Sequence, residues 1–145
     1  RRCELIVVSD GGQDGTCQFE DLGNAIRKVR IDMGVEITFP PKFDIYPRTA
    51  TTVSQGYVVG EIAYPAVPEE SLPAMKGRIV YLKPCFIRDM PADALSYGLM
   101  NAEFPHESTL DQWFSESQFE SYRSLGAFQA QRMLAGVGAD KLFTA

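Results

Sequence analysis

The sequence predicts a small α/β domain with a mixed sheet of about four strands, a βαβ-like N-terminal unit, a central hairpin and a helical C-terminal third. Three observations lead to this prediction. Within residues 3–39, two strand-like runs flank a segment whose apolar residues have helical spacing. Two further strand-like runs lie in the middle of the chain, and helical spacing dominates after Pro84. With 145 residues and no linker-like tract, we expect a single domain spanning residues 1–145.

The N-terminal unit starts with a short apolar run at residues 3–8, which predicts a buried strand that ends in a glycine-rich turn. A helix is predicted over residues 19–33 with Gly34 as its stop, and a second strand over residues 35–39. The apolar positions of this helix recur at intervals of four, three and four: Leu22, Ile26, Val29 and Met33. The crossover rule would place the two strands parallel in one sheet.

The middle of the chain carries strand composition at residues 56–64 and 77–83, separated by a proline-containing loop. Sequential strands usually neighbour one another, so these predict an antiparallel hairpin with a long loop. Helices are predicted over residues 92–100, from Ser108 or Asp111 to Tyr122, and over residues 127–134, with Gly126 as the break between the last two.

Aromatic residues are frequent in the C-terminal third, where several would share one helical face: Trp113, Phe114, Phe119, Tyr122 and Phe128. Such a face could bind lipid or a partner protein. An interfacial helix would carry lysines on its opposite face, and this segment lacks them. We therefore expect these aromatic residues to pack on the sheet.

Composition narrows the function classes. A formal charge of −5 argues against nucleic acid as a partner, and no apolar run is long enough to cross a bilayer. The three cysteines, Cys3, Cys17 and Cys85, have no C-x-x-C spacing, which argues against a disulfide framework or a zinc site and favours a reducing, cytoplasmic compartment. Arg1 leads at once into a strand-like run, which suggests a piece of a longer chain.

Two long motifs carry a resemblance to a known family. The first is RRCELIVVSD at residues 1–10, continued by FEDLGNAIRKVRIDMG at residues 19–34. The second is FPHESTLDQWF at residues 104–114, continued by QFESYRSLG at residues 118–126. The first resembles the segment just after the catalytic aspartate region of large bacterial patatin-like phospholipases. The second is similar to a segment near the end of the same hydrolase region, and residues 77–84 match as well.

The resemblance implies a three-layer α/β fold and a Ser-Asp dyad, in which a serine in G-x-S-x-G attacks an ester and an aspartate in an Asp-Gly-Gly motif acts as base. This chain contains no G-x-S-x-G. The implied function is therefore that of the C-terminal part of a serine lipid acyl hydrolase, acting on phospholipid or other lipid esters together with the remainder of the hydrolase domain. Membrane association would come through the parent protein.

Three residues are candidates for a site. Ser54, in Thr-Val-Ser-Gln-Gly, is the nearest approach to the nucleophile motif, but it lacks the first glycine and precedes a predicted strand instead of following one. Asp10 stands in Asp-Gly-Gly at the carboxyl end of a strand, whereas the resemblance places the dyad aspartate upstream of residue 1; we weigh a catalytic base against a turn or helix-capping role and favour the latter. His106, the only histidine, is either a structural anchor before a helix or a helper at the lipid cleft.

Other interpretations remain open. Asp10 and Asp14 could bind a divalent cation, and the glycines between them could hold a phosphate, but neither motif spacing is present and turn chemistry explains them better, so no metal or cofactor is expected. The alternative function is a non-catalytic interaction or regulatory domain. A third is a small hydrolase that uses Ser54 or Ser9 with Asp10. A homodimer would cover an orphaned sheet edge.

Overall fold

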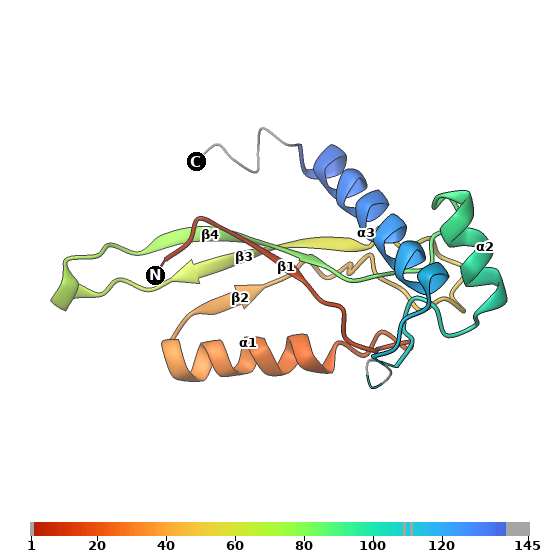
Figure 1. Cartoon of the computed structure of the whole chain (residues 1–145). Coiled ribbons are helices and arrows are strands. Elements are labelled where there is room, and N and C mark those ends of the chain that lie inside the picture. The colour runs from red at the N-terminus through yellow and green to blue at the C-terminus, as the bar shows by residue number, and fades with distance from the viewer. Residues whose placement is uncertain (1, 109, 111, 139–145) are drawn as a thin grey trace.

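The computed structural model describes residues 2–108, 110 and 112–138. These residues form a mixed α/β fold with a four-stranded sheet and three α-helices, the last of them C-terminal, which confirms the predicted class (Figure 1). The elements are β1 (Leu5–Ser9), α1 (Glu20–Met33), β2 (Glu36–Thr38), β3 (Tyr57–Tyr64), a short 3-10 helix η1 (Pro68–Glu70), β4 (Met75–Leu82), α2 (Ala92–Met100) and α3 (Glu116–Val137).

The strand order in the sheet is β1-β4-β3-β2. Strands β3 and β4 form the predicted antiparallel hairpin, in register from Tyr57 opposite Leu82 to Tyr64 opposite Met75. Strand β1 pairs with β4 in parallel, and β2 pairs with β3 antiparallel. The two strands of the βαβ-like unit therefore run parallel in one sheet, as predicted, but they lie at its opposite edges because the hairpin is inserted between them.

Helices cover both faces of the sheet, with α1 on one side and α3 on the other (Figure 1). Neighbouring residues of a strand point to opposite faces, and β4 shows both contacts. Buried Tyr81 packs in a cluster with Leu22 of α1, whereas fully buried Val80 packs with Met133 of α3. The central hairpin thus supplies both halves of the core.

Helix α1 matches its predicted range closely and ends at Gly34, which adopts the left-handed conformation of a helix C-cap and donates its N–H to the Arg30 carbonyl. Helix α2 spans the predicted residues 92–100. Two other predictions were wrong. The third helix begins at Glu116 and not at Ser108 or Asp111, because Ser115 caps it by accepting a hydrogen bond from the Gln118 N–H. It also continues through Gly126 without a break, since an isolated glycine weakens a helix but does not end it.

The aromatic residues of the C-terminal third behave differently from one another. Tyr122 and Phe128 are half-buried in the cluster between α2 and α3, as a core role predicts. Trp113 and Phe114 lie before α3 and are exposed, and Phe119 is exposed on its first turns, so the prediction that they pack on the sheet was wrong. No helix in the described part of the chain is both long enough and apolar enough to cross a membrane.

Candidate functional site

The candidate site lies where two parallel strands end. Ser9 of β1 pairs with Leu82 of β4, and the Asp10 N–H donates to the Leu82 carbonyl at 2.9 Å. The next residue of each strand end, Asp10 and Lys83, therefore emerges at the same edge of the sheet. In α/β folds this carboxyl edge is where ligands usually bind.

Asp10 and Lys83 form a largely buried ion pair. The Lys83 Nζ lies 3.0 Å from Asp10 Oδ2, and the lysine side chain is only 2% exposed against 18% for the aspartate. The same ammonium donates to the Gly12 carbonyl at 3.0 Å, while the Gly12 N–H donates to Asp10 Oδ1 at 2.8 Å. The Tyr81 hydroxyl donates to Asp10 Oδ2 as well. Both oxygens of the carboxylate therefore accept hydrogen bonds from groups of this chain.

These contacts set the protonation of the cluster. Burial by itself would raise the pKa of Asp10, but the hydrogen bonds from Tyr81 and Gly12 and the charge of Lys83 outweigh it and hold that pKa below 3.8. Burial and the neighbouring carboxylate raise the pKa of Tyr81 well above 10. At neutral pH the cluster holds an ionised aspartate and a protonated tyrosine.

The loop after Asp10 is fixed by Asp14. Its Oδ1 accepts from the Gln18 N–H and its Oδ2 from the Phe19 N–H, both at 2.9 Å, so it satisfies backbone donors at the start of α1. This loop borders an open cleft of about 370 Å³ that is lined by Asp10, Lys83 and carboxylates of α1. Among the described residues, no three histidine, cysteine, aspartate or glutamate side chains are placed to hold a metal ion.

His106 anchors the same loop from the other side. It is 7% exposed and follows the cis peptide bond between Phe104 and Pro105, and its Nδ1 accepts a long hydrogen bond of 3.4 Å from the Asp14 N–H. Burial, assisted by the charge of Lys83, lowers the pKa of His106 below 6.5 against the opposing effect of Asp14. The imidazole is therefore neutral at neutral pH, as its acceptor role requires.

Ser54 lies in the loop before β3, and its side chain is committed to that loop. The residue is 4% exposed, and its hydroxyl accepts from the Tyr46 N–H at 2.8 Å and donates to the Tyr46 carbonyl at 3.0 Å. Asp10 accepts hydrogen bonds from Tyr81, Lys83 and Gly12. Among the described residues, no hydrogen bond joins Asp10 to Ser54. The structure thus brings Asp10 close to the His106 loop but forms no Ser54–Asp10 pair.

The cysteines are not paired with one another in the structure. Burial raises the pKa of Cys17 to about 11, with a further contribution from Asp14, and it raises the pKa of Cys85 to about 12. Both thiols are protonated near neutral pH and are poor nucleophiles.

Sequence reasoning did not single out Lys83. The available signal was a lysine at the end of an apolar strand, just before Pro84, a position where a charge needs a partner. The chain was also compared with protein-family models, with curated proteins and with solved structures, and none of them matches. The family assignment therefore stays a prediction from the sequence motifs.

Proposed function

We propose that this chain is the C-terminal part of a patatin-like serine lipid acyl hydrolase, which hydrolyses phospholipid or other lipid esters with a nucleophile supplied by the remainder of the hydrolase domain. The long motifs at residues 1–34 and 104–126 support the family. The α/β architecture, with helices on both faces of the sheet, agrees with the implied fold.

The observation that carries the proposal is the set of contacts that the Asp10 carboxylate makes inside the chain. A general base needs a free acceptor within hydrogen-bond reach of the proton that it removes. Asp10 Oδ2 already accepts from the Tyr81 hydroxyl and the buried Lys83 ammonium, and Oδ1 accepts from the Gly12 N–H. These contacts hold the pKa of Asp10 below 3.8, which makes its carboxylate a weak base. Asp10 and Lys83 hold the turn after β1, which supports the view that the dyad aspartate lies elsewhere in the parent protein.

Ser54 supports the same view. A nucleophilic serine of this family type sits on a sharp turn from a strand into a helix, with its hydroxyl exposed. Ser54 precedes a strand, is buried, and uses its hydroxyl both as donor and as acceptor towards the Tyr46 backbone. In this proposal it stabilises a loop and does not attack a substrate.

The test is esterase activity of the purified chain on a short-chain p-nitrophenyl ester, beside Ser54→Ala and Asp10→Ala, with circular dichroism to verify that each protein is folded. We expect no turnover above buffer and no adduct with a fluorophosphonate by intact mass. Turnover lost in a folded Ser54→Ala variant would refute the proposal. The coding sequence gives a second test: G-x-S-x-G followed by Asp-Gly-Gly upstream of residue 1 is expected, and an open reading frame that starts directly before Arg1 would favour the alternatives.

The alternative is a non-catalytic interaction or regulatory domain on the same scaffold. It is favoured by the exposed Phe114 and Phe119, which border an apolar hollow and would be unusual on a surface without a binding role. A parent protein whose upstream half lacks a nucleophile would make this the better description.

A further inference from the structure

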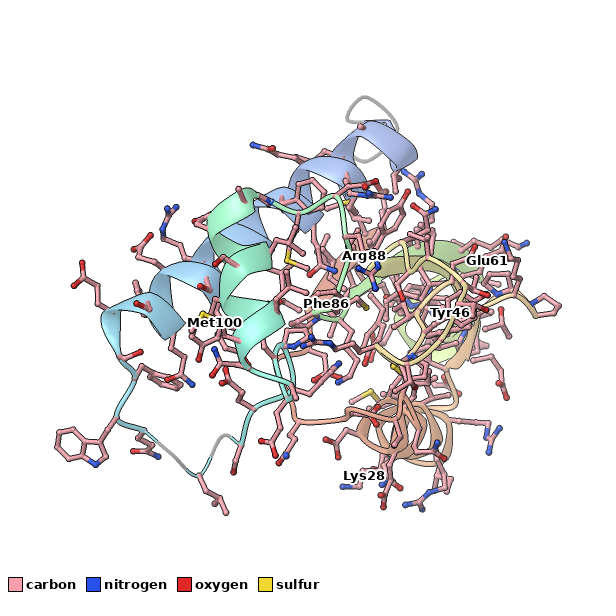
Figure 2. The ribbon with its side chains drawn as sticks, turned by 90° about the vertical axis from the view of Figure 1, so that its right-hand side faces the viewer. Lys28, Tyr46, Glu61, Phe86, Arg88 and Met100 are labelled. Atoms are coloured by element: carbon pink, nitrogen blue, oxygen red, sulfur yellow. The ribbon has the colours of Figure 1, made fainter. Side chains whose placement is uncertain are left out.

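Strand β1 lies at one edge of the sheet and is poorly covered. None of its residues is buried, and Val7 exposes 51% of its surface, whereas residues 79–81 of the neighbouring β4 are all buried. Figure 2 shows α1 and α3 on opposite sides of the sheet, with Lys28 on the outer side of α1. The helices therefore cover the faces of the sheet and leave this edge open. Among the described residues, no strand pairs with the outer side of β1.

The hydrogen bonds between β1 and β4 show which backbone groups of β1 face outward. The Glu4 carbonyl accepts from the Arg78 N–H at 2.7 Å, and the Asp10 N–H donates to the Leu82 carbonyl at 2.9 Å. The backbone groups of successive strand residues point alternately to the two sides of the strand, so the even-numbered residues of β1 face β4. The odd-numbered residues direct their N–H and C=O groups away from the sheet. They are Leu5, Val7 and Ser9.

The opposite edge of the sheet is protected, whereas β1 is not. Strand β2 is only three residues long, its first residue Glu36 is exposed, and the chain runs on into Pro40 and Pro41. Short length, charge and proline are the ordinary means of preventing edge-to-edge pairing. Between Glu4 and Asp10, β1 contains neither a charged residue nor a proline. With one open edge in the described part of the chain, pairing leads to a closed dimer and not to a fibre.

A second copy of the chain fits this edge through a twofold axis at Val7. In an antiparallel pair centred there, Val7 lies opposite Val7 of the second copy, and Leu5 lies opposite its Ser9. No other antiparallel register of β1 with itself places every outward residue opposite an outward residue. The three outward N–H groups of each strand then meet carbonyls of the other strand, which gives about six hydrogen bonds.

The side chains of β1 suit the same register. On the α1 side of the sheet, half-exposed Ile6 would lie opposite half-exposed Val8 of the second copy, and both would become more buried. Glu4 would lie opposite Asp10 of the second copy. The charge of that aspartate is balanced by the Lys83 ammonium at 3.0 Å, so two uncompensated carboxylates do not meet. The strand is thus complementary to itself.

We propose that the chain forms a twofold-symmetric dimer in which the two β1 strands pair antiparallel and the two sheets join into one continuous sheet. The surfaces that meet are isologous, as in most closed dimers. Because the contact is a single short strand pair, the expected Kd is on the order of 10 µM. This inference does not depend on the proposed hydrolase function.

The first test is the mass of the chain in solution, measured by sedimentation equilibrium from about 1 to 300 µM. We expect a reversible monomer–dimer transition. Val7→Lys should weaken the dimer at least about tenfold, because the two lysines would lie opposite one another. Val53→Lys is the matched control, since Val53 is 62% exposed in the loop before β3, and it should dimerise as wild type does. Circular dichroism verifies that both variants are folded.

A second test reports on the backbone and the register. Amide exchange at Leu5, Val7 and Ser9 should slow as the protein concentration rises, whereas the Ile6 and Val8 amides, which face β4, should be protected at all concentrations.

Cross-linking tests the twofold axis. Directly opposite residues in a hydrogen-bonded pair have Cα atoms about 5.5 Å apart, which is within the range of a disulfide. In a Cys3→Ser background, Val7→Cys should form a linked dimer with oxidised glutathione, and the control Val53→Cys should link much more slowly.

Three outcomes would overturn the proposal. They are a monomer at all concentrations, a folded Val7→Lys variant that dimerises as wild type does, and cross-linking of Val7→Cys no faster than that of Val53→Cys. If the chain is monomeric and a lysine-flanked LIVVS peptide slows exchange at Leu5, Val7 and Ser9, the edge instead binds a strand of another protein. Esterase activity of the chain bears on the hydrolase proposal alone, so the two proposals can fail separately.

Discussion

The ion pair between Asp10 and Lys83 gives a sharp stability prediction, because its two partners are buried to different extents. Asp10→Ala leaves the ammonium of Lys83, which is only 2% exposed, with the Gly12 carbonyl as its remaining partner. Lys83→Met leaves the Asp10 carboxylate, which is 18% exposed and keeps its hydrogen bonds from Tyr81 and Gly12. Asp10→Ala leaves the more buried charge without its partner, so it should lower the free energy of unfolding more than Lys83→Met does.

The magnitudes follow from the desolvation of each orphaned ion. Removing one partner of a buried pair typically lowers the free energy of unfolding by about 3–5 kcal/mol, which we expect for Asp10→Ala. For Lys83→Met, partial solvation and the two surviving hydrogen bonds reduce the loss to about 1–3 kcal/mol. The double variant buries no unpaired charge and should lose only about 1–2 kcal/mol, so Lys83→Met should rescue Asp10→Ala.

Urea unfolding followed by far-ultraviolet circular dichroism measures all four proteins of this double-mutant cycle. The pH adds a check on the mechanism. Because the folded pKa of Asp10 is lowered, the pair stabilises the protein above pH 3.8 and loses this effect as the pH falls through the folded pKa. The gap between wild type and Lys83→Met should therefore narrow in acid.

The reasoning is refuted if Lys83→Met is at least as destabilising as Asp10→Ala. It is also refuted if the two losses simply add in the double variant, since an additive cycle means that the two charges do not interact.

Further variants test other parts of the structure. Gly126→Ala should stabilise the protein by about 0.5–1 kcal/mol, because the residue lies inside α3 and nothing lies within 4 Å of an added Cβ; destabilisation in urea titrations would indicate a break at this position after all. Gly60→Ala should destabilise it by more than about 2 kcal/mol, because its Cβ would lie 2.5 Å from a backbone oxygen of the segment ending β2; an unchanged urea midpoint would contradict the β2–β3 register. Ser54→Ala should lower the free energy of unfolding by about 1–3 kcal/mol and speed hydrogen exchange at the Tyr46 amide, whereas normal protection there would argue against the loop contact. His106→Gln should flatten the loss of stability below pH 6.5, because the unfolded chain takes up the proton before the folded one; an equally steep thermal-melt profile would show that His106 titrates normally.

Local patterns predicted the fold well where the determinants lie within a few residues. The spacing of apolar residues and the stop at Gly34 defined α1, and β-branched runs on either side of a proline-containing loop defined the hairpin. Gly126 misled the prediction because a glycine lowers helix propensity wherever it stands, and packing of Leu125 and Met133 on either side of it stabilises the helix. Propensity alone does not contain that contribution.

Only one of the two charged residues of the candidate site, Asp10, could be predicted from the sequence. The position of Asp10 at a strand end follows from the local run and the glycines behind it. The pairing of Asp10 with Lys83 cannot be predicted from local sequence, because nothing near Lys83 shows that β4 pairs with β1 instead of lying at an edge of the sheet. The exposure of Trp113 and Phe114 was missed for a related reason, since the helix start at Ser115 depends on a cap that several nearby serines and threonines could have supplied.

The parallel pairing of β1 with β4 has a consequence for how the chain folds. Asp10 and Lys83 are 73 positions apart, and closing a loop of this length has an entropic cost of about 4 kcal/mol. The hairpin and α1 need no such closure and can form first, so docking of β1 is expected to be the slow event, as it is for non-local strand pairs in general. The strand-end cluster would then be assembled only in the last step, and its integrity would report on completion of the whole sheet.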